Sequence, residues 1–126
     1  MASGSEPLDQ RLRNGTTWYI IQSQSEWWRT RSVREGWVRR RDMRLAHKLH
    51  TLGWLEDHAS DILSDAAKRL YQESKDSLFG NDLIAEADYL EDMAASEDSA
   101  HLAVRGTRFY QRLLFDINDR LGSGYK

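Results

Sequence analysis

Apolar side chains that recur every three or four residues are the feature that most limits the fold of this sequence. In residues 54–75 the recurring positions are Leu55, Ile62, Ala66 and Leu70. In residues 96–121 they are Leu102, Phe109, Leu113, Ile117 and Leu121. This spacing places each set on one face of a helix. Because the chain of 126 residues contains a single proline, few helices are interrupted, and the sequence predicts an all-α protein.

Capping residues and glycines divide this pattern into separate helices. Ser32 and Glu35 match the capping box and predict a helix over residues 32–52 that ends before Gly53. The next helix is expected over residues 54–75. A turn at residues 79–82 then precedes a short helix with the stripe Leu83, Ala87, Leu90 and Ala94.

Ser96 is expected to cap a last helix that continues through Gly106 to Leu121. A helix-turn-helix with Gly106 at its turn is the alternative for residues 96–114, but the apolar stripe keeps its phase there, which favours one helix. Four to five helices with short connections are typical of an antiparallel bundle.

The amino-terminal part of the chain is less regular. A helical turn is expected over Leu8 to Arg13, within a loosely ordered segment of residues 1–15. Residues 16–23 are expected to form either a helix or a short strand, and a helix is slightly favoured. Their β-branched and aromatic side chains suit a strand, but apolar residues also recur there at helical spacing. Residues 16–126 are expected to form a single helical-bundle domain, as the length suggests.

Several functional classes are disfavoured by residues that the sequence lacks. It has no cysteine, which excludes disulfides and thiol catalysis. Its longest purely apolar run has four residues, 18–21, whereas a membrane span needs about 20. With no signal peptide visible, a cytoplasmic location and no membrane contact are expected. No cofactor is expected, because no phosphate-binding glycine loop is seen.

A metal site is also not expected, although the chain has four histidines. His47 and His50 are three residues apart and could share a face of a helix, but the Glu-x-x-His spacing of di-iron bundles is absent. His58 and His101 stand alone in the sequence, so a structural or solvent-facing role is the simpler interpretation for each of them.

The strongest functional signal is residues 27–41, WWRTRSVREGWVRRR, with three tryptophans and six arginines. On a helix over residues 32–52, Val38, Leu45, Leu49 and Leu52 would face the core, leaving Trp37 among arginines. Tryptophan and arginine are enriched in protein-interface hot spots, and an indole beside guanidinium groups also suits a nucleobase and its phosphates. The predicted partner-binding residues are Trp27, Trp28, Arg34, Trp37, Arg39 and Arg41. Arg105, Arg108 and Arg112 could add a second basic patch.

A structural role is the competing interpretation for part of this cluster. Arg40, Arg44 and Lys48 repeat every four residues before Gly53, as Asp57, Asp61 and Asp65 do after it. A hairpin about Gly53 would pair the two rows. Charge is unevenly distributed along the whole chain: residues 1–50 hold ten Lys/Arg and five Asp/Glu, whereas residues 51–126 hold eight and fifteen. The two halves therefore attract each other.

The acidic residues are concentrated between positions 55 and 100, with thirteen Asp/Glu against three Lys/Arg. A surface of this kind can imitate a nucleic-acid backbone and occupy a basic groove on another protein. An acidic, nucleic-acid-mimicking inhibitor is therefore one functional alternative, and a solvated face is the other.

Residues 41–47, Arg-Asp-Met-Arg-Leu-Ala-His, resemble the arginine and histidine arrangement of small helical ribonucleases of the HEPN type. The resemblance covers seven residues. It implies an all-α fold and a dimeric site in which Arg41 stabilises phosphate charge and His47 transfers protons. Catalysis remains the minority interpretation, and no catalytic residue is assigned.

The sequence thus favours a small non-enzymatic binding, regulatory or accessory protein that attaches to a macromolecular partner. A protein partner is slightly preferred to RNA or single-stranded DNA, and self-association is left open. The site would be the surface of Trp27, Trp28, Arg34, Trp37, Arg39 and Arg41.

Overall fold

The computed structural model describes residues 7–30 and 36–123, which contain seven α-helices, one 3-10 helix and two short strands. In chain order these are α1 (Gln10–Arg13), α2 (Thr17–Ser23), β1 (Trp27–Arg29), β2 (Trp37–Arg39), η2 (Arg40–Asp42), α3 (Leu45–Asp57), α4 (Ala59–Ser74), α5 (Gly80–Ala94), α6 (Glu97–Arg105) and α7 (Arg108–Ser123). The predicted all-α class is confirmed, and the two strands are a small addition to it.

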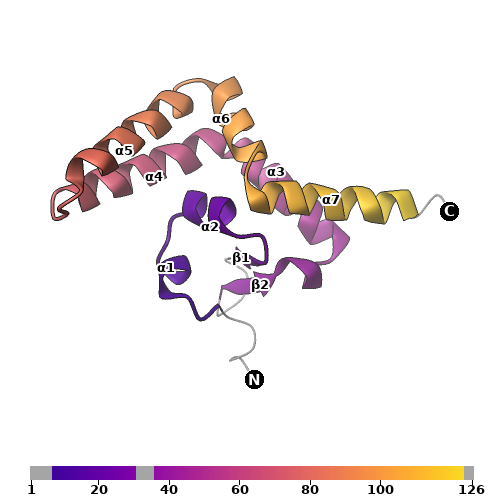
Figure 1. Ribbon diagram of the computed structural model, residues 1–126. Helices are drawn as coiled ribbons and strands as arrows, with labels where there is room; N and C mark the ends of the chain where they lie inside the picture. Colours follow the sequence, from indigo (N-terminus) through magenta and orange to yellow (C-terminus); the bar gives the residue numbers. More distant parts are fainter. Residues whose placement is uncertain (1–6, 31–35, 124–126) are drawn as a thin grey trace.

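The helices are arranged around one main core. α4 and α5 pair as a hairpin that projects from the rest of the molecule as an arm (Figure 1). α3, α6 and α7 pack together at the other end, and α2 packs against both α4 and α7. The core contains the fully buried side chains of Leu55, Leu63, Phe109 and Leu113. No helix among residues 7–30 and 36–123 has both the length and the apolar character required to cross a membrane.

The amino-terminal elements are helical, which resolves the ambiguity at residues 16–23. Thr16 caps α2, its hydroxyl accepting a hydrogen bond from the Tyr19 amide at 3.3 Å. Ile20 and Ile21 are both buried but belong to different clusters, because neighbouring helical residues differ in direction by about 100°. The predicted turn before this helix is also present as α1, which buries Leu12.

The predicted helix over residues 32–52 is wrong in its first half. Residues 37–39 form β2, which pairs antiparallel with β1 in the register Trp27↔Arg39, Trp28↔Val38 and Arg29↔Trp37. Gly36 enters β2 with φ +79, and its carbonyl accepts a hydrogen bond from the Thr30 amide at 2.7 Å. The capping-box residues Ser32 and Glu35 lie outside the described residues.

The predicted helix end at Gly53 is also wrong. α3 begins at Leu45 and continues through Gly53 to Asp57. A Cβ on Gly53 would have no neighbour within 4 Å, so this position lies on the open side of the helix. Thr51 and Leu55 are buried before and after it. The continuing buried face, and not the glycine, determines how far this helix extends.

Towards the carboxyl end the predicted pattern is partly confirmed. Ser96 caps α6, with its hydroxyl accepting a hydrogen bond from the Ser99 amide. Phe109 and Leu113 are buried as expected, but Leu102 is 69% exposed. The expected single helix is broken at Gly106 and Thr107, where the Thr107 hydroxyl donates to the Val104 carbonyl at 2.6 Å. α6 and α7 therefore bury different faces.

Candidate binding site: an arginine face beside α7

All three tryptophans of residues 27–41 are buried. Successive side chains of a strand point to opposite faces, so Trp27 and Trp28 are buried in two different hydrophobic clusters. Trp28 stacks on Phe109, with ring centroids 5.4 Å apart, and makes a T-shaped contact with Trp54 at 5.9 Å. Trp27 packs with Trp37 in a second cluster that includes Leu12. The predicted exposed helical surface with Trp37 among arginines is therefore wrong, because the segment is a strand.

The strand register places arginines directly over two of these indoles. Arg39 pairs with Trp27 across the strands, and its guanidinium carbon lies 4.6 Å from the indole centroid. Arg29 pairs with Trp37 in the same way at 5.9 Å. Such cation–π contacts cover the ring faces that a nucleobase would need. Arg34 lies outside the described residues.

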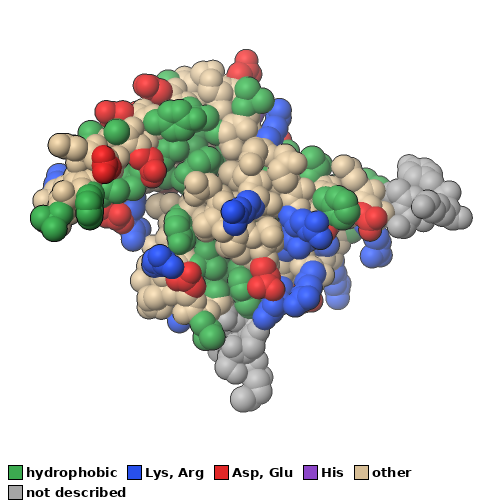
Figure 2. Space-filling view, in the orientation of Figure 1, with side chains coloured by type: hydrophobic (Ala, Val, Ile, Leu, Met, Phe, Trp, Pro, Cys, Tyr) green, Lys and Arg blue, Asp and Glu red, His purple; other side chains and the backbone are tan. Residues whose placement is uncertain are grey.

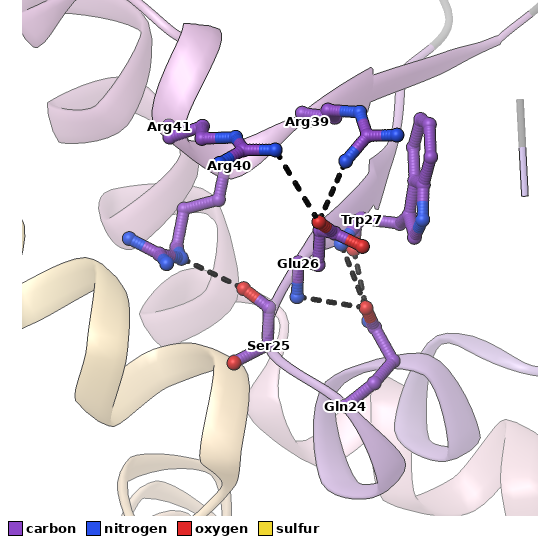
Figure 3. A network of polar contacts seen from close by, with 7 residues as sticks. All are labelled: Gln24, Ser25, Glu26, Trp27, Arg39, Arg40 and Arg41. Atoms are coloured by element: carbon purple, nitrogen blue, oxygen red, sulfur yellow. Dashed lines mark hydrogen bonds and ion pairs between the residues drawn. The ribbon is translucent and has the colours of Figure 1, made fainter. Parts of the chain in front are cut away.

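The connection between α2 and β1 organises the arginines that follow β2. The side-chain Oε1 of Gln24 accepts hydrogen bonds from the Glu26 and Trp27 backbone amides at 2.9 and 2.7 Å and so fixes the connection. The Glu26 carboxylate lies 2.7 Å from Arg39 Nη1 and 3.9 Å from Arg41 Nη2. Figure 3 shows both arginines directed at this one carboxylate. They are thereby held close together.

α7 is attached to the same connection by two contacts. Arg108 Nη1 donates to the Ser23 carbonyl at 3.3 Å. Two turns later, Asp116 pairs with Arg40 and, at 3.3 Å, with Lys48. Arg40 Nε in turn donates to the Ser25 carbonyl at 2.7 Å (Figure 3). The end of α2 and its connection to β1, residues 23–26, therefore run along α7.

These contacts bring Arg39 and Arg41 to the side of α7 that carries Arg108. Arg112 lies one turn after Arg108 on α7, and both are exposed, as is Arg41, whose side chain is 68% exposed. We call Arg39, Arg41, Arg108 and Arg112 the arginine face. Figure 2 shows Lys and Arg side chains collected over α7 and below it, near the β-hairpin. Part of the predicted site, Arg39 and Arg41, is thus joined to part of the predicted second patch, Arg108 and Arg112.

An exposed aromatic residue accompanies these arginines. Phe115 is 56% exposed, and the Arg112 guanidinium carbon lies 4.9 Å from its ring centroid. Phe115 was not among the candidate residues. The sequence could have indicated it, because Phe115 does not share the helical spacing of the buried positions Phe109, Leu113 and Ile117. A large aromatic residue off that stripe is expected to be exposed.

Arg105, the third member of the predicted second patch, has a different role. Its guanidinium donates two hydrogen bonds of 2.8 Å to the Glu56 carboxylate, which also accepts one from the Tyr110 hydroxyl. The bonds from Arg105 lower the pKa of Glu56. Burial and the bond to Glu56 raise the pKa of Tyr110 to about 12. This cluster joins α3 to α6 and α7.

The predicted pairing of two charged rows about Gly53 is wrong. Arg40 and Lys48 pair with Asp116 on α7, because α3 does not turn back at Gly53. Asp57, Asp61 and Asp65 are exposed on α3 and α4. The acidic residues Glu86, Asp88, Glu91 and Asp92 are exposed on α5. The arm is therefore an acidic surface separate from the arginine face.

The residues that resemble a ribonuclease motif do not share one helix. Arg41 belongs to η2 and is directed towards Glu26, whereas His47 belongs to α3. Partial burial and then the charge of His50 lower the pKa of His47. Within residues 7–30 and 36–123, no three His, Asp or Glu side chains are grouped in a way that could hold a metal ion.

Comparisons with protein-family models, characterised proteins and solved structures found no match. The chemistry of the exposed side chains is therefore the basis for inferring what the protein binds.

Proposed function

We propose that this protein is a small non-enzymatic binding protein that attaches through its arginine face to an acidic surface of a protein partner. The observation that carries this proposal is the gathering of Arg39, Arg41, Arg108 and Arg112 from separate segments, with Glu26 in contact with two of them. Guanidinium groups bind carboxylates through paired hydrogen bonds. Exposed Phe115 beside Arg112 adds an apolar anchor of the kind found in interface hot spots.

Burial of the tryptophans favours a protein partner over single-stranded nucleic acid. Proteins that bind single strands without sequence preference stack successive bases on several exposed aromatic rings. Trp27, Trp28 and Trp37 are buried, so among residues 7–30 and 36–123 Phe115 is the exposed aromatic ring that lies beside the arginine face. One ring provides one stacking position.

The acidic arm would help to orient the partner. An acidic surface is attracted by the arginine face and repelled by the exposed carboxylates of α4 and α5. Long-range fields of this kind steer association and exclude wrong orientations. The cytoplasm remains the proposed location of this interaction.

Photo-crosslinking in the cells that make this protein tests the proposal. Phe115 is replaced by a photoreactive phenylalanine, and exposed Tyr89 on α5 is replaced in the same way as the control. We expect a discrete protein adduct from position 115 that is absent from position 89. Arg41→Glu with Arg112→Glu should abolish the adduct, with helix content unchanged by circular dichroism. An adduct that survives charge reversal would contradict the proposal.

Nucleic-acid binding is the second candidate, and the break between α6 and α7 favours it. Two helices separated by Gly106 and Thr107 place exposed Arg108, Gln111 and Arg112 near the start of the second helix. This is where helix-turn-helix proteins contact bases. Fluorescent single-stranded RNA and duplex DNA should be titrated at several salt concentrations. Binding that falls steeply with salt and requires Arg108 and Arg112 would replace the protein partner with nucleic acid.

A further inference from the structure

Large apolar side chains are concentrated on the exposed surface of the α4–α5 arm. Four of the nine large hydrophobic residues that are exposed in the described part of the chain lie within residues 78–89. Leu78 and Phe79, 99% and 70% exposed, lie in the turn at the far end of the arm (Figure 1), and Ile84 and Tyr89, 40% and 61% exposed, follow on α5. We call these four residues the apolar strip. Exposed apolar side chains grouped in this way are typical of a contact surface.

The apolar strip continues along the side of α5 that faces solvent. α5 packs on α4 through its buried residues Ala87 and Leu90. Because successive helical residues differ in direction by about 100°, Ile84 and Tyr89 lie on the two flanks of the opposite side, with exposed Asp88 between them. The strip therefore follows one helix for about three turns beyond the tip of the arm.

Carboxylates alternate with the apolar strip. All five acidic residues of α5 are exposed, and α5 contains no Lys or Arg: they are Asp82, Glu86, Asp88, Glu91 and Asp92. In the part of the chain that the structure describes, no Lys, Arg or His side chain lies within ion-pair distance of any of these five. Figure 2 shows hydrophobic and acidic side chains next to one another over the arm. The exposed side of α5 is thus both apolar and negatively charged.

We infer that this side of the arm binds a basic amphipathic helix of a partner protein. The apolar strip would receive the apolar face of that helix, and the carboxylates on either side would pair with Lys or Arg along its edges. Amphipathic helices are recognised through apolar residues at spacings of three and four. A partner helix that lies along α5 meets both apolar and acidic side chains over its whole length.

The chemistry of the strip favours such a partner over a second copy of this chain or a membrane. A second arm is equally acidic and would be repelled. The arginine face of a second copy is positive, but it offers one large exposed apolar residue, Phe115, to meet the four of the strip. Anionic lipids would be repelled by the carboxylates of α5. A basic helix with a continuous apolar face matches both properties.

This site is separate from the arginine face, so the inference does not depend on the proposed function. The strip belongs to the α4–α5 turn and α5, whereas the arginine face belongs to β2, η2 and α7. The two surfaces carry opposite charge. A protein that uses both would connect a basic partner at its arm with an acidic partner at α7.

A synthetic helix tests the inference. The probe is a fluorescein-labelled peptide of about 18 residues, or about five turns, with leucines on one face and lysines elsewhere. Its binding to the full chain is measured by fluorescence anisotropy at about 0.15 M salt, where long-range attraction is largely screened. Leu78→Ser with Tyr89→Ser should weaken binding at least about tenfold, the effect of losing apolar anchors. Leu102→Ser with Phe115→Ser is the matched control on α6 and α7, with binding unchanged.

The charges are tested with a second pair of variants. Glu91→Gln with Asp92→Asn should weaken binding several-fold, because both carboxylates lie beside the strip. Asp42→Asn with Asp57→Asn removes two exposed carboxylates that lie outside the arm and should have little effect. Thermal unfolding should be the same for all four double variants and the wild-type chain.

A peptide with the same residues in scrambled order, which has no apolar face, should bind at least about tenfold more weakly. Equal binding of the two peptides, or binding unaffected by the strip variant, would overturn the inference. Sedimentation equilibrium of the full chain supplies the remaining test. Self-association that is lost in Leu78→Ser with Tyr89→Ser would assign the strip to a second copy instead.

Discussion

Trp28 is buried because of the strand that carries it. On a helix, two adjacent tryptophans cannot both point at one core, since their directions differ by about 100°. On β1 they point to opposite faces, and the molecule has apolar side chains on both. Trp28 stacks on Phe109 and contacts Trp54. At the residue scale, the cluster that suggested a binding surface is largely part of the core.

Truncation of Trp28 should therefore be strongly destabilising. Trp28→Ala is expected to lower the free energy of unfolding by about 3–5 kcal/mol, because it removes a large apolar side chain and leaves a cavity. Urea denaturation followed by circular dichroism measures this loss. Arg41→Ala, at an exposed position, is the control and should change stability by less than about 0.5 kcal/mol. Equal effects of the two substitutions would contradict the buried position of Trp28.

Glu56 should make stability depend on acidic pH. Hydrogen bonds from Arg105 lower its folded-state pKa, so its stabilising contribution is present above the unfolded pKa of about 4.3 and is lost as pH falls through the folded pKa. Glu56→Gln should reduce stability by about 1 kcal/mol at pH 7, a small loss because Arg105 is half exposed to solvent.

The measurement is urea denaturation of both proteins between pH 7 and pH 3. The difference between wild type and Glu56→Gln should shrink as the pH falls. Glu91→Gln removes an exposed carboxylate on α5 and should give the same pH dependence as wild type. A constant difference between Glu56→Gln and wild type at every pH would rule out this ionic contribution.

At the element scale, the sequence was informative where one face of a helix is buried and the other is solvated. The stripes of α4 and α5 and the Ser96 cap follow this rule, and Ala66, Ala87 and Leu90 are buried as predicted. The strand at Trp37 was missed because three residues are too few to distinguish alternation from helical spacing. The arginines were recognised as a group, but the elements that bring Arg39 and Arg41 to α7 depend on contacts distant in sequence.

Glycines were the least reliable predictors of helix ends, because a helix continues past a glycine when the next turn has side chains to bury. α3 continues past Gly53 because Leu55 falls on the same buried side as Thr51. α6 ends at Gly106, where the Gln111 side chain donates to the Arg105 carbonyl and the Thr107 side chain and amide both donate to the Val104 carbonyl. A helix end therefore requires partners for its carbonyls as well as a flexible residue.

Two glycine substitutions should have opposite effects for this reason. Gly36→Ala should destabilise the protein by about 1–2 kcal/mol, because φ +79 is strained for a residue with a Cβ. The new Cβ would also lie 3.2 Å from the Thr30 carbonyl oxygen. Gly53→Ala should stabilise by about 0.5–1 kcal/mol, because it lies inside α3 with open space around it. Thermal unfolding of both variants measures the two shifts, and shifts of the same sign would contradict the assigned conformations.

At the scale of the whole molecule, Asp116 links stability to the charge of the arginine face. It neutralises Arg40 and Lys48, and the side chains of all three residues are 13–15% exposed. These contacts join α7 to η2 and α3. Asp116→Asn should lower the free energy of unfolding by about 2–3 kcal/mol, because it leaves two partly buried cations without their carboxylate.

The same substitution should strengthen binding of an acidic ligand, because Arg40 and Lys48 lie beside the arginine face and would no longer be neutralised. Affinity for a poly-glutamate peptide, measured by fluorescence anisotropy at low salt, should rise several-fold in Asp116→Asn and fall in Arg112→Glu. Asp61→Asn on α4 changes the net charge equally and serves as the control, with little effect on stability or binding expected. If Asp61→Asn raised the affinity as much as Asp116→Asn, the net charge of the molecule, and not its arginine face, would govern binding.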